Sequence, residues 1–273
     1  MSAGEIPAVN REGPRLSILV VVHNEERRLA ECLATARFAD EIVVVLDRCT
    51  DRSAEIARDH GARLVEGGWP IEGDRRNAGL AACTGDWVLE LDADERVTPE
   101  LAAEIRRRLA TALSCRLAIR FDNRIGGRPV RHGWGAYNGV AQKDCLFPRG
   151  TKTWGRERVH PSLVWAEAVG DRRDVLDERL VHHVYADIAD MVAKLNRYST
   201  LAAEDAVEAG RVLPLPANLR RIPSRFWKSY VGRGGWREGD LGLALGLFSA
   251  LYPILTCLKA RAMTRDRADR SGG

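Results

Sequence analysis

The sequence predicts an α/β protein in which a mostly parallel sheet is flanked by helices and followed by a helical C-terminal extension. Runs of β-branched and aliphatic residues such as Leu16–Val22 are nearly continuous, as in strands that are buried on both faces. Helical patterns alternate with these runs over the first third of the chain. Strands and helices that alternate in this way are typical of a parallel sheet covered by helices.

The elements of the first third follow from apolar spacing and from their start and stop signals. We expect strands over Leu16–Val22, Glu41–Leu46, Arg63–Val65 and Trp87–Leu91. We expect helices over Glu25–Ala36, from Thr50 or Asp51 to near His60, and over Arg75–Ala82. Asn24 is a residue type that caps helix N-termini and precedes the first helix, while Gly61 follows the second as a stop signal.

After Asp94 the alternation ends. Thr98, Pro99 and Glu100 supply a cap, a proline at the first helical position and an acid near the positive helix end, so we expect a helix to about Ala112. A strand over Arg116–Phe121 and a long helix over Ile188–Gly210 are also expected. Residues 123–161 lack periodicity, which indicates either binding loops or strands that the pattern does not reveal.

Composition limits the class of protein. Of 273 residues, 45% are hydrophobic and 29% are charged, which suits one large domain with or without an appendage and excludes a disordered chain. The six cysteines form no CxxC pair, which argues against a zinc ribbon or a disulfide framework and favours a reducing compartment. Residues 1–15 are polar, show no secretory signal and are expected to be disordered. We expect one α/β domain over 16–210 and a separate extension over 211–273.

The net charge of +4 is unevenly distributed. Residues 211–273 contain twelve Lys or Arg against four Asp or Glu, and their basic side chains interleave with aromatic ones. Leu241–Leu258 carries no charge, a stretch that a nucleic-acid surface does not need, so nucleic acid is not expected as a partner. We expect an amphipathic helix on an anionic membrane surface; a spanning helix and a helix buried against the domain remain alternatives.

The first turn of the sheet excludes two common nucleotide sites. It reads His23-Asn24-Glu25-Glu26 and has no glycine, so the backbone cannot approach a pyrophosphate as it does in a nicotinamide or flavin site. The P-loop sequence GxxxxGK is also absent. A nucleotide bound here would need another means of neutralising its phosphates, and a metal ion is the obvious one.

The sharpest chemical signal is Asp92-Ala93-Asp94, directly after the strand Trp87–Leu91. Open α/β sheets bind ligands at this carboxyl edge. Side chains two residues apart in an extended segment point the same way, so the two carboxylates can share one Mg²⁺ or Mn²⁺ ion. The alternatives are a solvated acidic turn and a haloacid-dehalogenase nucleophile. The second is disfavoured because Glu95-Arg96 follow and three strands precede the motif.

A resemblance to the family 2 glycosyltransferases of GT-A (Rossmann-like) fold is carried by VVHNEE, DRCTDRS, GDRRNAGLAACTGDWVLELDADE and TPEL. Later segments resemble the lipopolysaccharide-core β-glucosyltransferase branch of that family: RHGW, RVH at residues 158–160, and KLNRYSTLAAE at Lys194–Glu204. The resemblance extends from Leu16 to about Lys259.

The resemblance implies a nucleotide-sugar site formed by His23, Asn24, Glu25, Asp47, Arg76, Asn77 and Asp92. Asp47 would contact the base, although the turn Leu46-Asp47-Arg48-Cys49 departs from the family's acidic-glycine-serine pattern and leaves the base open, with UDP as first choice. Arg76 suits a diphosphate through charge-assisted hydrogen bonds. The implied ligands of a divalent metal, Mg²⁺ or Mn²⁺, are Asp92, Asp94 and His182.

The implied mechanism is direct displacement with inversion, in which the metal and Arg76 stabilise the leaving nucleoside diphosphate. A carboxylate base would deprotonate the acceptor hydroxyl, but Pro161 stands where relatives have a Glu. Glu157, Asp144 and His160 therefore remain candidates for the base, each with an ordinary surface role as the alternative. Arg131, His132 and Trp134 are candidates for acceptor binding, with packing as the alternative for Trp134.

By the same resemblance, the expected function is transfer of a hexose, glucose first, from a nucleoside-diphosphate sugar to a glycolipid such as lipopolysaccharide core. The enzyme would be peripheral on the cytoplasmic face of a bacterial inner membrane, because confinement to the surface raises the effective acceptor concentration. The alternatives are a polyprenyl-phosphate glycosyltransferase and a degenerate relative that binds nucleotide sugar without turnover.

Overall fold

The computed structural model describes residues 13–111, 115–134, 142–157, 161–212 and 214–271. The chain forms two compact units, Met1–Asp122 with Gln142–His182, and Asn123–Ala141 with His183–Gly273. This division differs from the expected boundary at residue 210. The long helix that we assigned to the α/β domain belongs to the second unit, because its contacts are with the C-terminal helix.

One mixed sheet forms the centre of the first unit, in the order β3-β2-β1-β4-β8-β6-β11-β5. Its parallel part consists of β1 (Leu16–Val22), β2 (Glu41–Asp47), β3 (Arg63–Gly67) and β4 (Trp87–Leu91). Beyond β4 come β8 (Gln142–Pro148), β6 (Arg116–Ile125), β11 (Arg173–Tyr185) and β5 (Glu95–Arg96), with antiparallel pairs β4–β8, β6–β8 and β11–β5. The expectation of a mostly parallel sheet therefore holds only for the first four strands.

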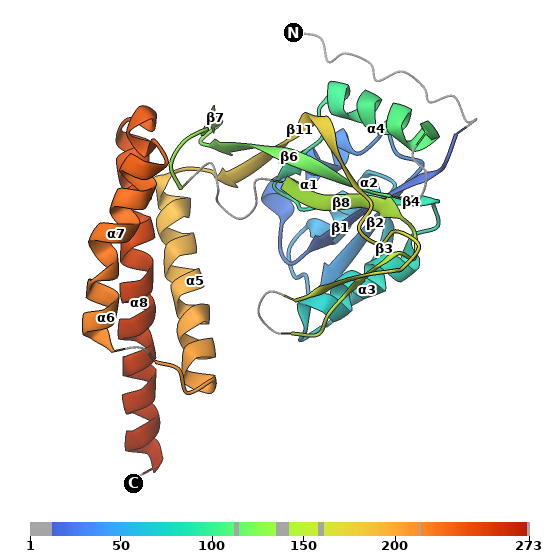
Figure 1. The fold of residues 1–273 in the computed structure, drawn as a ribbon. Coiled ribbons are helices and arrows are strands. Elements are labelled where there is room, and N and C mark those ends of the chain that lie inside the picture. The colour runs from blue at the N-terminus through green and yellow to red at the C-terminus, as the bar shows by residue number, and fades with distance from the viewer. Residues whose placement is uncertain (1–12, 112–114, 135–141, 158–160, 213, 272–273) are drawn as a thin grey trace. The chain divides into compact units, whose positions relative to one another are not determined.

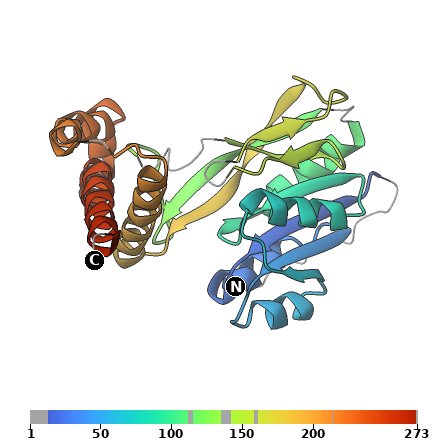
Figure 2. The ribbon, with the colours of Figure 1, turned by 90° about the horizontal axis from the view of Figure 1, so that it is seen from below.

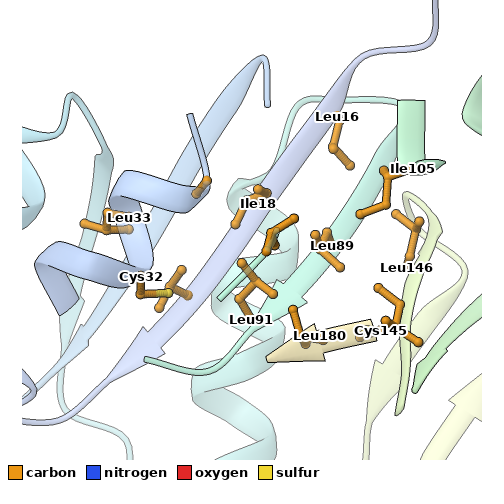
Figure 3. Close-up of a cluster of buried hydrophobic side chains, with 14 of the residues drawn as sticks. Leu16, Ile18, Cys32, Leu33, Leu89, Leu91, Ile105, Cys145, Leu146 and Leu180 are labelled. Atoms are coloured by element: carbon orange, nitrogen blue, oxygen red, sulfur yellow. The ribbon is translucent and has the colours of Figure 1, made fainter. Parts of the chain in front are cut away.

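Helices cover both faces of this sheet. On one face lie α1 (Glu26–Thr35), α2 (Ser53–Asp59) and α4 (Pro99–Thr111), packed on a cluster that includes the residues labelled in Figure 3. On the other face lies α3 (Glu72–Ala82), with a smaller cluster around Val43, Val88 and Phe147. Since the strands alternate their side chains between two buried faces, they appear in the sequence as continuous apolar runs.

The expected elements of the first third are confirmed, with small shifts at their ends. The expectation that Thr50 or Asp51 caps α2 is wrong, because the N-cap is Arg52 and no side chain caps that helix. Asp51 is nearby, and its Oδ1 accepts a hydrogen bond from the Ser53 backbone N–H at 3.0 Å. The expectation that Asn24 caps α1 is wrong, because the N-cap is Glu25 and no side chain caps that helix. Asn24 has φ +56° and its side chain binds the neighbouring loop instead.

The segment that lacked periodicity contains strands. Within its described residues β6 continues to Ile125, β7 (Arg128–Pro129) pairs with β6, and β8 adds to the main sheet. A separate two-stranded sheet consists of β9 (Lys152–Trp154) and β10 (Leu163–Trp165). β8 begins with Gln142, Lys143 and Asp144, all half-buried, so its first half does not show an apolar pattern.

The second unit is mainly helical. It contains α5 (Ile188–Glu208), α6 (Leu215–Leu219), α7 (Arg221–Trp227), the short π-helix η2 (Lys228–Gly232), the 3-10 helix η3 (Gly235–Glu238) and α8 (Asp240–Ser271). Both views show α5 beside α8 (Figures 1 and 2). α8 is long and apolar enough to cross a membrane by length and composition, and 39% of its most apolar window is buried inside the protein.

A half-buried lysine joins α5 to α8. The Lys259 ammonium lies 2.7–2.8 Å from the Asn196 carbonyl and side-chain oxygens and from the Ser199 and Thr200 hydroxyls. These three partners belong to the KLNRYST segment that resembles the lipopolysaccharide-core branch. The polar residues of that segment therefore hold two helices together within the second unit.

None of the six cysteines forms a disulfide in this structure. Burial raises the pKa of Cys32, Cys83 and Cys145 to about 12, so these three stay protonated at neutral pH. We expect a maleimide to modify only the half-buried Cys49 and Cys115 in the native protein, and all six cysteines after denaturation. Mass spectrometry of the labelled peptides measures this, and fast native labelling of Cys145 would contradict the core as described.

Candidate active site

The loops that follow β1 and β2 are tied to each other. His23 Nδ1 lies 2.6 Å from the Asp47 carbonyl oxygen, and the Asn24 side-chain oxygen accepts a hydrogen bond from the Thr50 backbone N–H at 2.8 Å. The Glu25 backbone N–H donates to the Ser53 hydroxyl at 3.0 Å. Among the described residues, Asn24 and Arg48 are the only non-glycine residues with positive φ. Such backbone strain is typical of functional loops and is maintained here by these hydrogen bonds.

Asp47 is buried at the end of β2. Its carboxylate accepts two hydrogen bonds from the Arg48 guanidinium at 3.0 Å, one from the Trp69 backbone N–H at 3.0 Å and one from Arg75 at 3.2 Å. Burial alone would raise the pKa of Asp47, but these donors outweigh it and the pKa lies below its ordinary value. A base contact by Asp47 stays a prediction, and it would require the exposed Arg48 side chain to give up its position.

Arg76 and Asn77 on α3 both engage Trp154 on β9. The Arg76 guanidinium lies 4.7 Å from the Trp154 ring centroid, and its Nη2 lies 3.4 Å from Asp92 Oδ1. Asn77 exchanges two hydrogen bonds with the Trp154 backbone, at 2.8 and 2.9 Å. Asn77 therefore positions β9 in this structure, and a direct contact between Asn77 and the nucleotide sugar stays a prediction.

Asp92 lies between two protein cations. Lys143 Nζ is 2.8 Å from Asp92 Oδ2, and Arg76 reaches the other oxygen. Lys143 also contacts Glu95 at 3.1 Å, and Glu95 accepts a hydrogen bond from the Asp92 backbone N–H at 2.9 Å. Burial alone would raise the pKa of Asp92, but Lys143 and Arg76 hold it well below its ordinary value. Burial dominates at Glu95 and raises its pKa to about 7.

Asp94 lies close to His182 because of the register in which two strands of the sheet pair. β5 and β11 pair antiparallel with His182 opposite Glu95, and this brings His182 Nε2 within 3.8 Å of Asp94 Oδ2. Arg28 on α1 approaches the same Asp94 oxygen at 3.8 Å. The His182 ring packs against Phe121, with the ring centroids 5.0 Å apart. The expected metal ligands Asp94 and His182 thus lie together, on elements 88 residues apart in the chain by their numbering.

A divalent ion fits these donors only with help from a substrate. Within the described ranges, no group of three or more His, Cys, Asp or Glu side chains could hold a metal ion by itself. Both Asp92 oxygens are engaged by cationic groups, which leaves one carboxylate and one imidazole, Asp94 and His182. A carboxylate oxygen and an imidazole nitrogen suit Mn²⁺ or Mg²⁺ when phosphate oxygens and water fill the other positions.

The structure gives no strong support to a catalytic base. Asp144 forms ion pairs with Arg173 at 2.7 Å and Arg116 at 3.3 Å, so two guanidinium groups engage its oxygens. Glu157 is exposed and accepts hydrogen bonds from the Ser162 backbone N–H and hydroxyl, which lower its pKa. His160 lies outside the described residues. The role of each residue as base stays a prediction.

The expected acceptor residues belong to the second unit and are held there by Glu238. This buried carboxylate accepts hydrogen bonds from the Arg131 and His132 backbone N–H groups at 2.9 and 3.0 Å and lies 2.9 Å from His132 Nδ1. Gly133 has φ +69°, and a Cβ added there would lie 2.9 Å from the Gly235 Cα. Arg131, His132 and Trp134 thus form one loop packed on the C-terminal helices, and acceptor binding by them stays a prediction.

Sequence reasoning missed Lys143, Glu95 and Trp154. Lys143 lies on the strand that showed no pattern, and its contact with Asp92 depends on the position of β8 in the sheet. Glu95 is next to the acidic pair in the sequence and could have been considered as a third acid. Trp154 was hidden in the segment without periodicity.

Comparison with known proteins identifies the family. Residues 17–158 match the model of "Glycosyl transferase family 2", about half of the chain. The chain belongs to this family. The lipopolysaccharide core biosynthesis glycosyltransferase LpsC of Rhizobium meliloti is 26% identical over 261 residues, 89% of this chain and 91% of LpsC. An uncharacterized glycosyltransferase of Rickettsia bellii is 26% identical over 264 residues, 92% of this chain and 87% of its own.

Solved structures resemble this chain only at low similarity. Glucosyl-3-phosphoglycerate synthase from Mycobacterium tuberculosis, crystallised with Mn²⁺, UDP and glucosyl-3-phosphoglycerate, is 20% identical with a TM-score of 0.44, covering 63% of this chain and 72% of that one. The mixed sheet flanked by helices is the GT-A arrangement that the sequence motifs imply. This protein is a glycosyltransferase of GT-A fold, and the strands that carry its acidic motif lie within the matched residues.

Proposed function

We propose that this enzyme transfers a hexose, with glucose as first choice, from a UDP-sugar to a cell-envelope glycolipid such as lipopolysaccharide core, with the help of a divalent metal. The observation that carries the proposal is the Asp94–His182 pair beside Asp92, Arg76 and Lys143 at the carboxyl edge of the parallel strands. The likeness to LpsC over 89% of the chain supports a glycolipid acceptor.

The proposed site separates two tasks. Asp94 and His182 would hold the metal, which supplies positive charge to the diphosphate as it leaves. Arg76 would donate hydrogen bonds to the same diphosphate, and the Trp154 ring and Asp92 keep its guanidinium oriented for this. Lys143 adds a second fixed cation next to Asp92, so that negative charge developing on the leaving group meets groups already in place.

Binding of the donor is the direct test. We expect UDP-glucose with Mn²⁺ to raise the melting temperature, because a ligand that binds only the folded state at about 100 times its Kd adds about 2.7 kcal/mol of stability. UDP-glucose without metal should give a smaller shift, and GDP-mannose is a matched control for the base and the sugar. Equal melting temperatures with and without all nucleotide sugars would contradict the proposal.

Membrane attachment is part of the same proposal. Exposed apolar side chains recur along one side of α8, at Leu243, Leu247, Leu251 and Leu258, and α5 adds Ile188 and Val192. With the basic residues of 211–273 they support peripheral attachment to the cytoplasmic face of the inner membrane. Cell fractionation tests this: we expect the enzyme in the membrane fraction at low salt, and full recovery in the soluble fraction would contradict attachment.

A further inference from the structure

A cluster of arginines surrounds Trp134 in the second unit. The guanidinium carbon of Arg225, on α7, lies 5.1 Å from the Trp134 ring centroid, and that of Arg233, after η2, lies 4.9 Å from it. The Trp134 backbone N–H donates to the Ser229 hydroxyl at 3.2 Å, which fixes the loop against η2. One indole ring therefore holds two guanidinium groups from two different segments.

The cluster concentrates positive charge. Arg221 lies one helical turn before Arg225 on α7 and faces the same way. Burial and the charge of Arg221 lower the pKa of Arg225. Two guanidiniums on one ring are within about one Debye length of each other, roughly 10 Å, so salt does not screen their repulsion fully. A single stacked arginine would be enough to pack the ring.

Arg221 and Arg225 lack acidic partners in the part of the chain that the structure describes. No carboxylate lies within salt-bridge distance of either guanidinium, and the Arg225 Nε donates to the Ser249 carbonyl oxygen at 2.8 Å. In the first unit, by contrast, Arg75 and Arg76 both face carboxylates. The Nη groups of Arg225 keep their donors for an external acceptor, and the planar arginine fork matches a phosphate group.

The chain segment that carries the arginines also carries exposed apolar side chains. Trp227 is 65% exposed and Trp236 is 55% exposed, and both lie in the same short segment as the arginines. Leu243 and Leu247, at the start of α8, are exposed as well. Exposed tryptophans beside basic residues are typical of protein surfaces at the level of lipid headgroups. A soluble anion would gain nothing from exposed apolar side chains, whereas a lipid presents a phosphate and acyl chains together.

We propose that Trp134, Arg225 and Arg233, together with Arg221, form a binding site for the phosphate group of a lipid. This inference rests on the membrane attachment proposed above and names the group that the attached protein would recognise. It also gives Trp134 a role that differs from sugar binding, since the ring holds the two guanidiniums in place for the phosphate. Binding by a defined site differs from general attraction of the basic extension to a charged surface.

Vesicle binding by charge variants distinguishes a defined phosphate site from general attraction of the basic extension to a charged surface. The experiment is flotation with phosphatidylcholine vesicles that contain phosphatidic acid, at physiological salt. It compares the vesicle binding of two full-length double variants, Arg225→Gln/Arg233→Gln and Arg211→Gln/Arg265→Gln. The second variant is the control: it removes two exposed arginines of the same unit, and it lowers the net charge by the same amount. We expect the first pair to weaken binding roughly thirtyfold, since one basic side chain near the surface contributes about 1 kcal/mol. We expect the second pair to weaken binding several times less, because Arg211 and Arg265 lie outside the cluster. Equal losses in the two pairs would overturn the site.

The ring and the source of the phosphate have their own tests. Trp134→Leu should weaken vesicle binding like the arginine pair and Trp134→Phe should retain most of it, because a phenyl ring still holds guanidiniums. Circular dichroism and the melting temperature must match those of the wild type for the comparison to count, and Arg225→Lys serves as a second variant that keeps the charge but loses the fork. Displacement from the vesicles by millimolar inorganic phosphate would overturn a lipid as the ligand.

The outcome for this site is distinguishable from that for the proposed function. A wild-type protein that shows the UDP-glucose shift but no binding to phosphatidic acid vesicles overturns this site and the membrane attachment on which it rests, and leaves the proposed sugar transfer in place. Vesicle binding that depends on Arg225 and Arg233, without any nucleotide-sugar shift, supports the lipid site and overturns the proposed donor.

Discussion

Asp94→Asn is expected to lower kcat/KM for sugar transfer by about three orders of magnitude while the fold stays intact. Asparagine keeps the size and shape of the side chain but removes the negative charge that would bind the metal beside His182. The ion-pair contacts of Asp94 with Arg28 and His182 are long, both 3.8 Å, so the loss of charge should cost little stability. Steady-state transfer with UDP-glucose and Mn²⁺ measures the effect.

A second readout separates loss of metal from loss of structure. The Mn²⁺-dependent part of the UDP-glucose thermal shift should vanish in Asp94→Asn, whereas the melting temperature without ligand should stay within a few degrees of the wild type. Asp171→Asn is the matched control, because Asp171 is exposed in a turn of the same unit. Unchanged turnover in Asp94→Asn would refute the metal role of this residue.

Lys152→Met is expected to destabilise the protein by about 3–5 kcal/mol, because it leaves the buried Glu90 without its cation. Lys152 and Glu90 form an ion pair with side chains only 1% and 2% exposed. The Lys152 ammonium also lies 4.8 Å from the Phe147 ring centroid and 4.5 Å from that of Trp154. Methionine can fill this aromatic surrounding, so the loss should come from the unpaired carboxylate rather than from packing.

The double variant tests this explanation. Glu90→Gln removes the buried charge while its side-chain oxygen can still accept the hydrogen bond that Trp154 Nε1 donates to Glu90 at 2.7 Å. Lys152→Met/Glu90→Gln should therefore recover most of the stability lost in Lys152→Met, as measured by the urea midpoint at constant m. Additive losses in the two single variants would show that packing, and not the unpaired charge, decides the effect.

Apolar periodicity was enough for the parallel half of the sheet. The runs at β1, β2 and β4 are buried on both faces, and a doubly buried strand can be recognised from a short window of sequence. The same reasoning failed at β8, whose half-buried Gln142, Lys143 and Asp144 give no apolar run. It also failed at the domain boundary, because α5 carries an ordinary amphipathic pattern that does not say which unit it packs on.

Some residues of the candidate site could be located from the sequence, and others could not. Asp92 and Asp94 could be located from the sequence, since both follow directly after a buried strand. His182 and Trp154 could not be located by this route, because their places depend on strand pairing between distant segments. The contact of Asn77 with β9 was also beyond the sequence: its neighbour Arg76 reaches Asp92, while the Asn77 side chain donates a hydrogen bond to the Trp154 carbonyl oxygen.

By itself, the sequence determined the alternation of strands and helices, the acidic pair at the sheet edge and the basic C-terminal extension with its uncharged stretch, because each is a local pattern of side-chain types. Only the tertiary structure decided that Lys143 and Arg76 flank Asp92, that His182 faces Asp94, and that Trp134 holds two arginines. The physical reason is that these contacts join residues many positions apart. Their formation depends on the pairing of strands and the packing of helices, which no short stretch of sequence encodes.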